Sequence, residues 1–296
     1  MRKLHRPSTN AKSAHVAIIP PELEFFSLAK VPLDALKWPL TRPEAIEGKT
    51  VADLSENDHL ISYAKSRIFF YPRFGVRAKV SVMFTEPAAL HANKMRYATI
   101  LQWRFHRFLT INKNLLKTVR IARRFNALGT WIPDWSTVDT TKTKMISLIA
   151  SSKKYLLGHQ MRHEAADWLR KNNPQADILG RAYLPFDQKS EGLAAYRYSV
   201  IIENVREEGY FTEKLIDSFL CRTIPIYWGA PDVEETFDSR GMIVCETFDE
   251  IVRAFSEISE ADYLEKLPYL EKNRELAIKF SNPRLDAAKF ILKDDN

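Results

Sequence analysis

The chain has 296 residues, 45% of them hydrophobic and 27% charged, which is ordinary for a folded globular protein and enough for two hydrophobic cores. Its net charge of +7 at neutral pH suits an anionic partner, such as a polyanion, an anionic membrane surface or a phosphorylated substrate. No stretch approaches the roughly 20 apolar residues of a membrane-spanning helix, and no apolar core follows the basic N-terminal residues, so we expect neither a membrane anchor nor a signal peptide.

The two cysteines indicate a reducing compartment. Cys221 and Cys245 both lie in apolar stretches, and they lack the CxxC spacing of a metal or redox site. We therefore expect a cytoplasmic protein.

Short apolar runs that stop at prolines predict strands in the N-terminal half, at residues 15–19, 67–71 and 79–84. The C-terminal half alternates more regularly. Its predicted strands are residues 144–150, 177–180, 198–202, 224–228 and 242–244, and its predicted helices are residues 159–171, 212–221 and 249–258. This alternation predicts an α/β fold with a parallel sheet covered on both faces.

The polar segment 134–144 is typical of a domain break. We therefore expect an N-terminal domain over residues 1–140, a second domain over residues 141–262 and a C-terminal helical tail over residues 263–296.

A carboxylate and an amide stand at the end of the apolar run 198–202, where Glu203 and Asn204 follow one another. Ligands of open α/β sheets bind outside the carboxyl ends of the strands. The next predicted helix begins with Glu213 and Lys214, and its free backbone N–H groups suit a phosphate. Lys214 would add a cation for a diphosphate, and Glu213 would accept hydrogen bonds from sugar hydroxyls.

Tyr210, just before this helix, is placed to cover a base or sugar face. A simpler interpretation is that Thr212 only caps the helix and that Glu213 only complements its dipole. For these two residues alone, the simpler interpretation is the stronger one.

The whole string ENVREEGYFTEKL, followed by CRTIPIYWGAPDVEETF, resembles the donor-binding signature of the family 10 glycosyltransferases, the α-1,3/1,4-fucosyltransferases, in their bacterial form. In that family an E-N dipeptide is followed, nine residues on from the Asn, by the Glu of a Y-x-T-E-K motif. Asn204 and Glu213 keep this spacing. The resemblance covers residues 144–237 and is weaker over the N-terminal half.

The resemblance implies a GT-B fold, in which two Rossmann-like domains face each other across a cleft. It also implies an inverting transfer of L-fucose from GDP-fucose to a hydroxyl of a glycan acceptor, with no metal and no cofactor. The sequence is consistent with metal independence, because it has no D-x-D motif. Asp167 also stands where an H-E-x-x-H motif would have its second His. Arg, Lys and backbone donors would then meet the diphosphate charge.

Further donor-site candidates follow from the same resemblance. Arg162, in SSKKYLLGHQMRHEAADWL, resembles the family's phosphate-binding arginine near the start of the domain's first helix, although a surface helix residue is the alternative. His159 is a second cationic candidate there. Lys189, in DQKSEGLAAYRYSVIIEN, is a candidate cleft residue.

Glu86 is the candidate catalytic base. Inversion needs a carboxylate that takes the proton of the acceptor hydroxyl as it attacks. Glu86 follows the predicted strand 79–84 and resembles the family's acceptor-motif Glu in F-E-S-P, although Thr85 and Pro87 depart from that pattern. An exposed loop carboxylate is the alternative. A cleft rich in Arg and Lys would favour its ionised form.

Three further interpretations concern donor, acceptor and location. Val205 stands where the family usually carries Ser, so a nucleotide sugar other than GDP-fucose stays open. The lumenal anchor and disulfides of animal relatives have no counterpart, which favours a cytoplasmic, bacterial-type enzyme acting on a lipid-linked or lipopolysaccharide-type glycan. The basic segment 104–124 would face an anionic acceptor or the inner face of the membrane, and a solvated helix face is an equal alternative.

Two rivals come from other classes. The basic charge also suits a nucleic-acid-binding protein, but the sequence has no helix-turn-helix, RRM or zinc-finger signature. A catalytically inactive scaffold with the same fold is the other rival, and the intact candidate residues argue against it.

Overall fold

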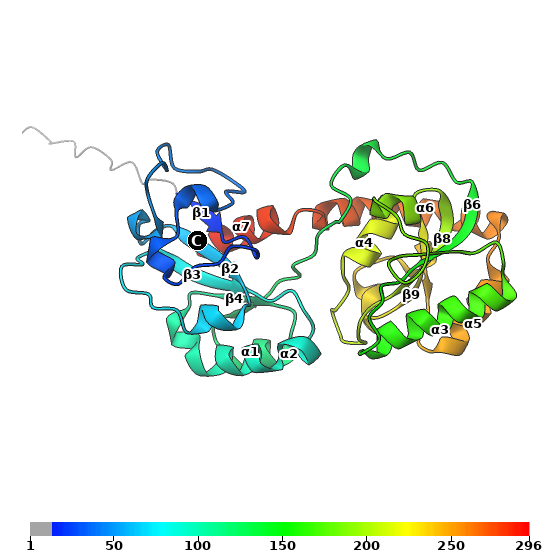
Figure 1. Ribbon diagram of the computed structural model, residues 1–296, viewed down its shortest axis with the longest axis horizontal. Helices are drawn as coiled ribbons and strands as arrows, with labels where there is room; N and C mark the ends of the chain where they lie inside the picture. Colours follow the sequence, from blue (N-terminus) through cyan, green and yellow to red (C-terminus); the bar gives the residue numbers. More distant parts are fainter. Residues whose placement is uncertain (1–13, 296) are drawn as a thin grey trace, which may run out of the picture.

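Two five-stranded parallel sheets organise residues 14–295, which are the residues that the computed structural model describes (Figure 1). Most of the basic N-terminal segment lies outside the described residues. Within them, no helix is both long enough and apolar enough to cross a membrane. Cys221 and Cys245 are both buried, free thiols.

The first sheet keeps its strands in chain order. These strands are β1 (Val16–Ile18), β2 (His59–Tyr63), β3 (Lys79–Met83), β4 (Phe108–Thr110) and β5 (Ala122–Arg124). Helices α1 (Ala88–Leu101) and α2 (Lys113–Thr118) pack together beside it. An aromatic core around Phe69, Phe84 and Phe108 fills the space between the sheet and these helices.

The strand predicted at residues 67–71 is wrong, because this stretch forms a 3₁₀ helix, η4 (Ser66–Phe69). Successive residues of a strand point to opposite faces of a sheet. Ile68 and Phe69 follow one another, yet both are buried in the same hydrophobic core. A tight helical turn brings both side chains to that core, whereas a strand would expose one of them.

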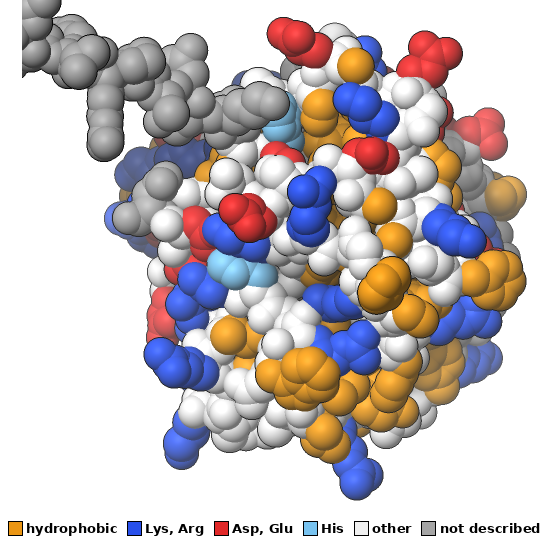
Figure 2. Space-filling view, turned by 90° about the vertical axis from the view of Figure 1, so that its left-hand side faces the viewer, with side chains coloured by type: hydrophobic (Ala, Val, Ile, Leu, Met, Phe, Trp, Pro, Cys, Tyr) orange, Lys and Arg blue, Asp and Glu red, His pale blue; other side chains and the backbone are white. Residues whose placement is uncertain are grey.

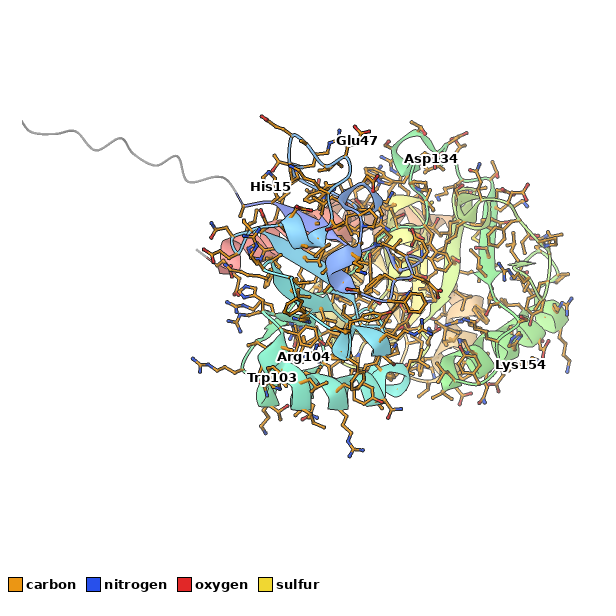
Figure 3. All side chains as sticks on the ribbon, turned by 60° about the vertical axis from the view of Figure 1, so that its left-hand side comes forward. His15, Glu47, Trp103, Arg104, Asp134 and Lys154 are labelled. Carbon is orange, nitrogen blue, oxygen red and sulfur yellow. The ribbon has the colours of Figure 1, made fainter. Side chains whose placement is uncertain are left out.

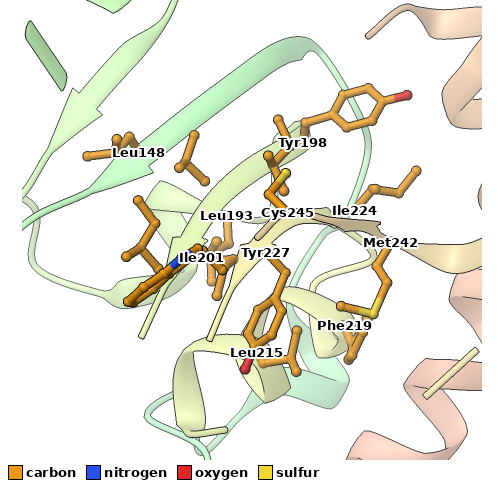
Figure 4. Packing of buried hydrophobic residues seen from close by; sticks show 14 of the residues in the cluster. Leu148, Leu193, Tyr198, Ile201, Leu215, Phe219, Ile224, Tyr227, Met242 and Cys245 are labelled. Atoms are coloured by element: carbon orange, nitrogen blue, oxygen red, sulfur yellow. The ribbon is translucent and has the colours of Figure 1, made fainter. Parts of the chain in front are cut away.

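The second sheet confirms the predicted alternation of strands and helices. Its order is β10–β9–β8–β6–β7, with bounds β6 (Lys144–Ile149), β7 (Asp177–Leu179), β8 (Tyr196–Ile202), β9 (Ile224–Trp228) and β10 (Ile243–Val244). Helices α3 (Leu157–Asn172) and α5 (Phe248–Glu257) pack together on one face, and α4 (Glu213–Leu220) covers the other. Figure 4 shows the core beneath α4, where Leu215 and Phe219 lie beside Tyr227. The order reverses between β6 and β8, which is where such sheets bind ligands.

The C-terminal helices divide between the two sheets. Helix α6 (Glu260–Phe280) packs on α4 in the second half. Helix α7 (Pro283–Asp294) crosses back, and its Ala287, Ala288 and Ile291 pack against the first sheet (Figure 1). The expected tail therefore belongs to both halves of the molecule.

The basic segment 104–124 does not form one helix face, because only residues 113–118 are in an α-helix. Two of its arginines face the chain's own acids: Arg107 and Arg123 both pair with Asp294 at the end of α7. Part of the positive charge of this segment is thus neutralised within the protein.

Candidate functional site

A cavity of about 760 Å³ lies where the carboxyl ends of the two sheets face each other. From the first half, Tyr63 at the end of β2 and Glu86 after β3 line it. From the second half, Ser151 after β6 and Asn204 after β8 line it, at the point where the strand order reverses. The location is the one expected for a ligand of a doubly wound sheet.

Glu203 lies beneath the cavity wall, and its side chain is fully buried. Its carboxylate accepts hydrogen bonds from the backbone N–H of Thr212 at 2.8 Å, from the Thr212 hydroxyl at 2.8 Å and from Lys214 Nζ at 3.1 Å. The prediction that Glu203 binds the donor directly is wrong in this geometry, because all its contacts point to the start of α4. Glu203 instead positions the N-terminus of that helix.

Asn204 and Arg162 lie in the cavity wall itself, next to the buried Glu203. Arg162 donates from Nη2 to Asn204 Oδ1 at 2.7 Å and from Nε to the carbonyl of Ile202 at 2.8 Å. The guanidinium is thus held in a fixed orientation by the end of β8. A fixed planar fork of N–H donors at a cavity wall suits a phosphate.

Gly158 allows the start of α3 to lie in direct contact with the backbone at the end of β8. A Cβ at this position would lie 1.7 Å from the carbonyl oxygen of Glu203, which no side chain tolerates. The N–H of Gly158 donates to the carbonyl of Asn204 at 3.1 Å. This contact explains how Arg162, one turn along α3, reaches Asn204.

The start of α4 carries a buried cluster of charges. Thr212 caps the helix, since its hydroxyl accepts from the N–H of Lys214. Burial opposes the ionisation of Glu213, but Lys214 and Lys189 outweigh it and hold the pKa of Glu213 below its ordinary value. Lys189 also pairs with the buried Asp217 at 2.7 Å. Glu213, Lys214 and Lys189 all line the cavity, as the sequence predicts for cleft residues.

His159 lines the cavity but does not supply a cation. Burial, together with the neighbouring Arg162 and Lys153, lowers its pKa to about 4. The ring is therefore neutral near pH 7, and the expectation of a cationic His159 is wrong. Its Nδ1 accepts from the N–H of Leu156, so the ring helps to cap α3.

Tyr210 lines the cavity with little of its ring, because it is only 3% exposed. Its hydroxyl is hydrogen-bonded to Asn204, and burial raises its pKa well above the ordinary range. The expectation that Tyr210 covers a base or sugar face does not fit this orientation.

Glu86 stands on the opposite wall, between the end of β3 and Pro87, which precedes α1. Its side chain is exposed to the cavity. Partial desolvation by the cavity walls raises its pKa, Glu213 adds to that effect, and Lys214 opposes it. The expectation that the surrounding cations favour its ionised form is therefore wrong in direction, because desolvation and Glu213 outweigh them.

Several residues of the cavity were not predicted from the sequence, among them Lys153, Trp131 and Arg284. Lys153 follows β6, so the rule that located Asn204 at a strand end would also have found it. Trp131 lies in the segment that joins the two sheets, and its ring stacks under Lys189 Nζ at 4.9 Å. Arg284 reaches the cavity from the start of α7, and no local signal in the sequence indicates it.

One group among the described residues has the composition of a metal site, namely His59, His106 and Asp295. It lies apart from the cavity, at the amino ends of the first sheet. The carboxylate of Asp295 forms an ion pair with Lys79 Nζ at 2.5 Å, and Arg107 is also close to it. A lysine and an arginine already supply the positive charge that a metal ion would bring.

Two parallel α/β domains with the cavity between their carboxyl ends define the GT-B class of glycosyltransferase fold. The protein TarM has the same fold, with a TM-score of 0.56 over 80% of this chain and 55% of that protein, at 12% identity. A family model, the C-terminal domain of glycosyltransferase family 10 (fucosyltransferase), matches residues 139–282. Residues 139–282 are therefore similar to the C-terminal domain of glycosyltransferase family 10.

Two relatives are similar to shorter stretches of this chain. The α-(1,3)-fucosyltransferase FucT of Helicobacter pylori is 35% identical over 95 residues, which are 32% of this chain and 18% of the relative. GDP-fucose protein O-fucosyltransferase 3 of Xenopus tropicalis is 36% identical over 89 residues, 30% of this chain and 17% of the relative. The matches span less than a fifth of the length of each of these relatives.

Proposed function

We propose that the protein is an inverting, metal-independent fucosyltransferase that transfers L-fucose from GDP-fucose to a hydroxyl of a glycan acceptor. The observation that carries the proposal is the cavity, with Glu86 on one wall and Arg162 and Lys214 on the other. The match of residues 139–282 to a fucosyltransferase family model supports fucose as the sugar. A lipid-linked or other cell-surface glycan, such as a lipopolysaccharide, is the proposed acceptor.

The charge of the cavity favours a diphosphate. Seven charged side chains line it, and only two of them are acids: Lys153, Arg162, Lys189, Lys214, Arg284, Glu86 and Glu213. Arg162 and Lys214 lie beside the N-termini of α3 and α4, where helix dipoles also favour an anion. These groups supply positive charge without a metal ion, which is why we propose metal independence.

In the proposed reaction, Glu86 accepts the proton of the acceptor hydroxyl as that oxygen attacks the anomeric carbon of fucose. The new carbon–oxygen bond forms on the face opposite the diphosphate, the bond to the phosphate oxygen breaks, and GDP leaves. The raised pKa of Glu86 suits this role, because a base with a pKa nearer to the working pH binds the transferred proton more strongly. Arg162 and Lys214 would stabilise the negative charge on the leaving diphosphate.

A panel of thermal-shift measurements tests the donor. GDP and GDP-fucose should each raise the melting temperature, with and without EDTA, whereas UDP should not. Stabilisation by UDP-sugars instead of GDP would overturn the choice of donor. If EDTA abolishes the rise in melting temperature with GDP, metal independence is wrong but the choice of donor stands. Steeply salt-dependent retention on DNA, without any nucleotide effect, would instead favour the nucleic-acid-binding rival.

A further inference from the structure

An exposed aromatic and basic surface lies on the first half of the molecule, away from the second sheet. Three of its side chains are almost wholly in solvent, with Phe26 94%, Phe74 97% and Trp103 78% exposed. Phe70 and Ile100 are more than half exposed. Large apolar side chains gathered in this way usually mark a surface that binds another molecule.

Contacts connect the segments that carry these residues, namely α1, η4 and the loops beside them, and the ring of Phe25 packs against Tyr71 with centroids 4.6 Å apart. The ring of Phe70 packs edge-on against Tyr97 of α1, with ring centroids 4.9 Å apart. Arg104 donates to the carbonyl of Tyr71 at 2.6 Å and lies over the ring of Trp103. We call this surface the α1 rim and define it by Phe26, Phe70, Phe74, Ile100 and Trp103.

The charge near Phe70, Phe74 and Trp103 is strongly one-sided, whereas two exposed acids, Glu22 and Glu24, lie close to Phe26 in the sequence. Residues 59–105 contain eight Lys or Arg and a single acid, Glu86, which faces the cavity. Arg67, Arg77 and Arg96 are exposed. Figure 2 shows this side of the molecule, where hydrophobic side chains alternate with Lys and Arg over the lower part, at the level of α1 in Figure 1. Figure 3 places Trp103 and Arg104 at that edge, far from Lys154.

We infer that the α1 rim docks on an anionic lipid membrane. Tryptophan, phenylalanine and isoleucine enter the boundary between headgroups and acyl chains, while the surrounding arginines remain among the anionic headgroups. A soluble polyanion would engage the arginines but would leave Ile100 and Phe74 in water. The combination of exposed apolar side chains with positive charge therefore selects a membrane.

The rim also has a suitable position relative to the cavity. Helix α1 has 14 residues, which is about 20 Å, and it runs from the side of Glu86 to Trp103. If the proposed function is correct, docking at the rim would hold the acceptor side of the cavity close to a lipid-linked glycan. The docking itself does not depend on that function.

Co-sedimentation of the full chain with vesicles tests the inference. We expect binding to vesicles of phosphatidylcholine with phosphatidylglycerol, little binding to phosphatidylcholine alone, and weakening as salt rises. The double variant Trp103→Ala with Phe74→Ala should bind at least tenfold more weakly. The variant Arg77→Gln with Arg96→Gln should also lose roughly tenfold or more.

Matched controls lie in the second half, where Leu264 and Lys171 are also exposed. Leu264→Ala and Lys171→Gln should leave vesicle binding unchanged, and an unchanged melting temperature should accompany every variant. Equal binding to neutral and anionic vesicles, or no binding to either, overturns the inference. So does an apolar double variant that binds like the unmodified chain, because the partner would then be recognised by charge alone.

Discussion

The carboxylate of Glu207 accepts a hydrogen bond of 3.0 Å from the backbone N–H of Ala88, across the boundary between the two halves of the molecule. Ala88 is the first residue of α1 and follows Glu86 by two positions. Glu207 lies in the loop between Asn204 and Tyr210. One hydrogen bond thus connects the loop of the proposed donor site to the helix that begins beside the proposed base.

Glu207→Ala should lower kcat by roughly tenfold and change GDP affinity little, because Glu86 loses its fixed position while Arg162 and Lys214 keep theirs. Steady-state kinetics together with GDP titration would show this. Glu208→Ala is the control, since that neighbouring carboxylate pairs with the exposed Lys113. Equal losses in both variants would mean that the loop as a whole, and not the Glu207 contact, is responsible.

Glu203→Ala should lower the free energy of unfolding by on the order of 3 kcal/mol, because it leaves Thr212 and Lys214 without their buried partner. Urea denaturation measures this. The control Glu246→Ala removes an exposed partner of Arg206, and it should cost less than about 1 kcal/mol. A Glu203 variant as stable as the Glu246 variant would contradict the positioning role.

Glu86→Gln should lower kcat by about a hundredfold or more, because glutamine keeps the shape of the side chain but cannot take the proton. GDP affinity should remain nearly unchanged, which separates loss of chemistry from damage to the fold. If turnover on the true acceptor stays close to that of the unmodified protein, another group accepts the proton.

Lys214→Ala and Arg162→Ala should each weaken GDP binding by roughly 2 kcal/mol, the scale of one charge-assisted contact. Arg162→Lys should lose part of that affinity, since lysine keeps the charge but cannot reach both Ile202 and Asn204. Isothermal titration in EDTA gives these values. Unchanged binding in both alanine variants would place the diphosphate elsewhere in the cavity.

Activity should fall on the acid side at a higher pH than donor binding does. The pKa of Glu86 is raised by partial desolvation and by Glu213, so Glu86 becomes protonated, and inactive as a base, above the ordinary glutamate range. Glu213 has a lowered pKa despite its burial, so it stays ionised to lower pH. The pH profile of kcat/KM should therefore lose activity while GDP-fucose still binds. A common pH dependence of both quantities would contradict this assignment.

The second sheet could be predicted closely because each of its strands is an apolar run that a helix follows. The end of β8 was harder to interpret, since adjacent residues of an extended chain point in opposite directions. The side chain of Asn204 faces the cavity, whereas that of Glu203 lies beneath α4. The sequence alone does not indicate which of the two side chains faces the cavity. The direction of a side chain at a strand end depends on what packs there.

The charge states of the site could not be predicted for a related reason. The pKa of His159 depends on burial and on Arg162 and Lys153, which approach it from different segments. The pKa of Glu86 depends on Glu213 from the other half of the molecule. Such neighbours come together only in the folded chain, whereas the spacing of Asn204 and Glu213 is local and visible in the sequence.

Helix α7 determines when the first sheet can be completed. Its Ala287, Ala288 and Ile291 cover Val16, Ile18 and the other buried residues on one face of the first sheet. During synthesis, the ribosome releases the strands of that sheet long before it makes α7, with the whole second sheet in between. That face of the first sheet thus stays uncovered until α7 emerges, so the first sheet is completed only after the second sheet has been made.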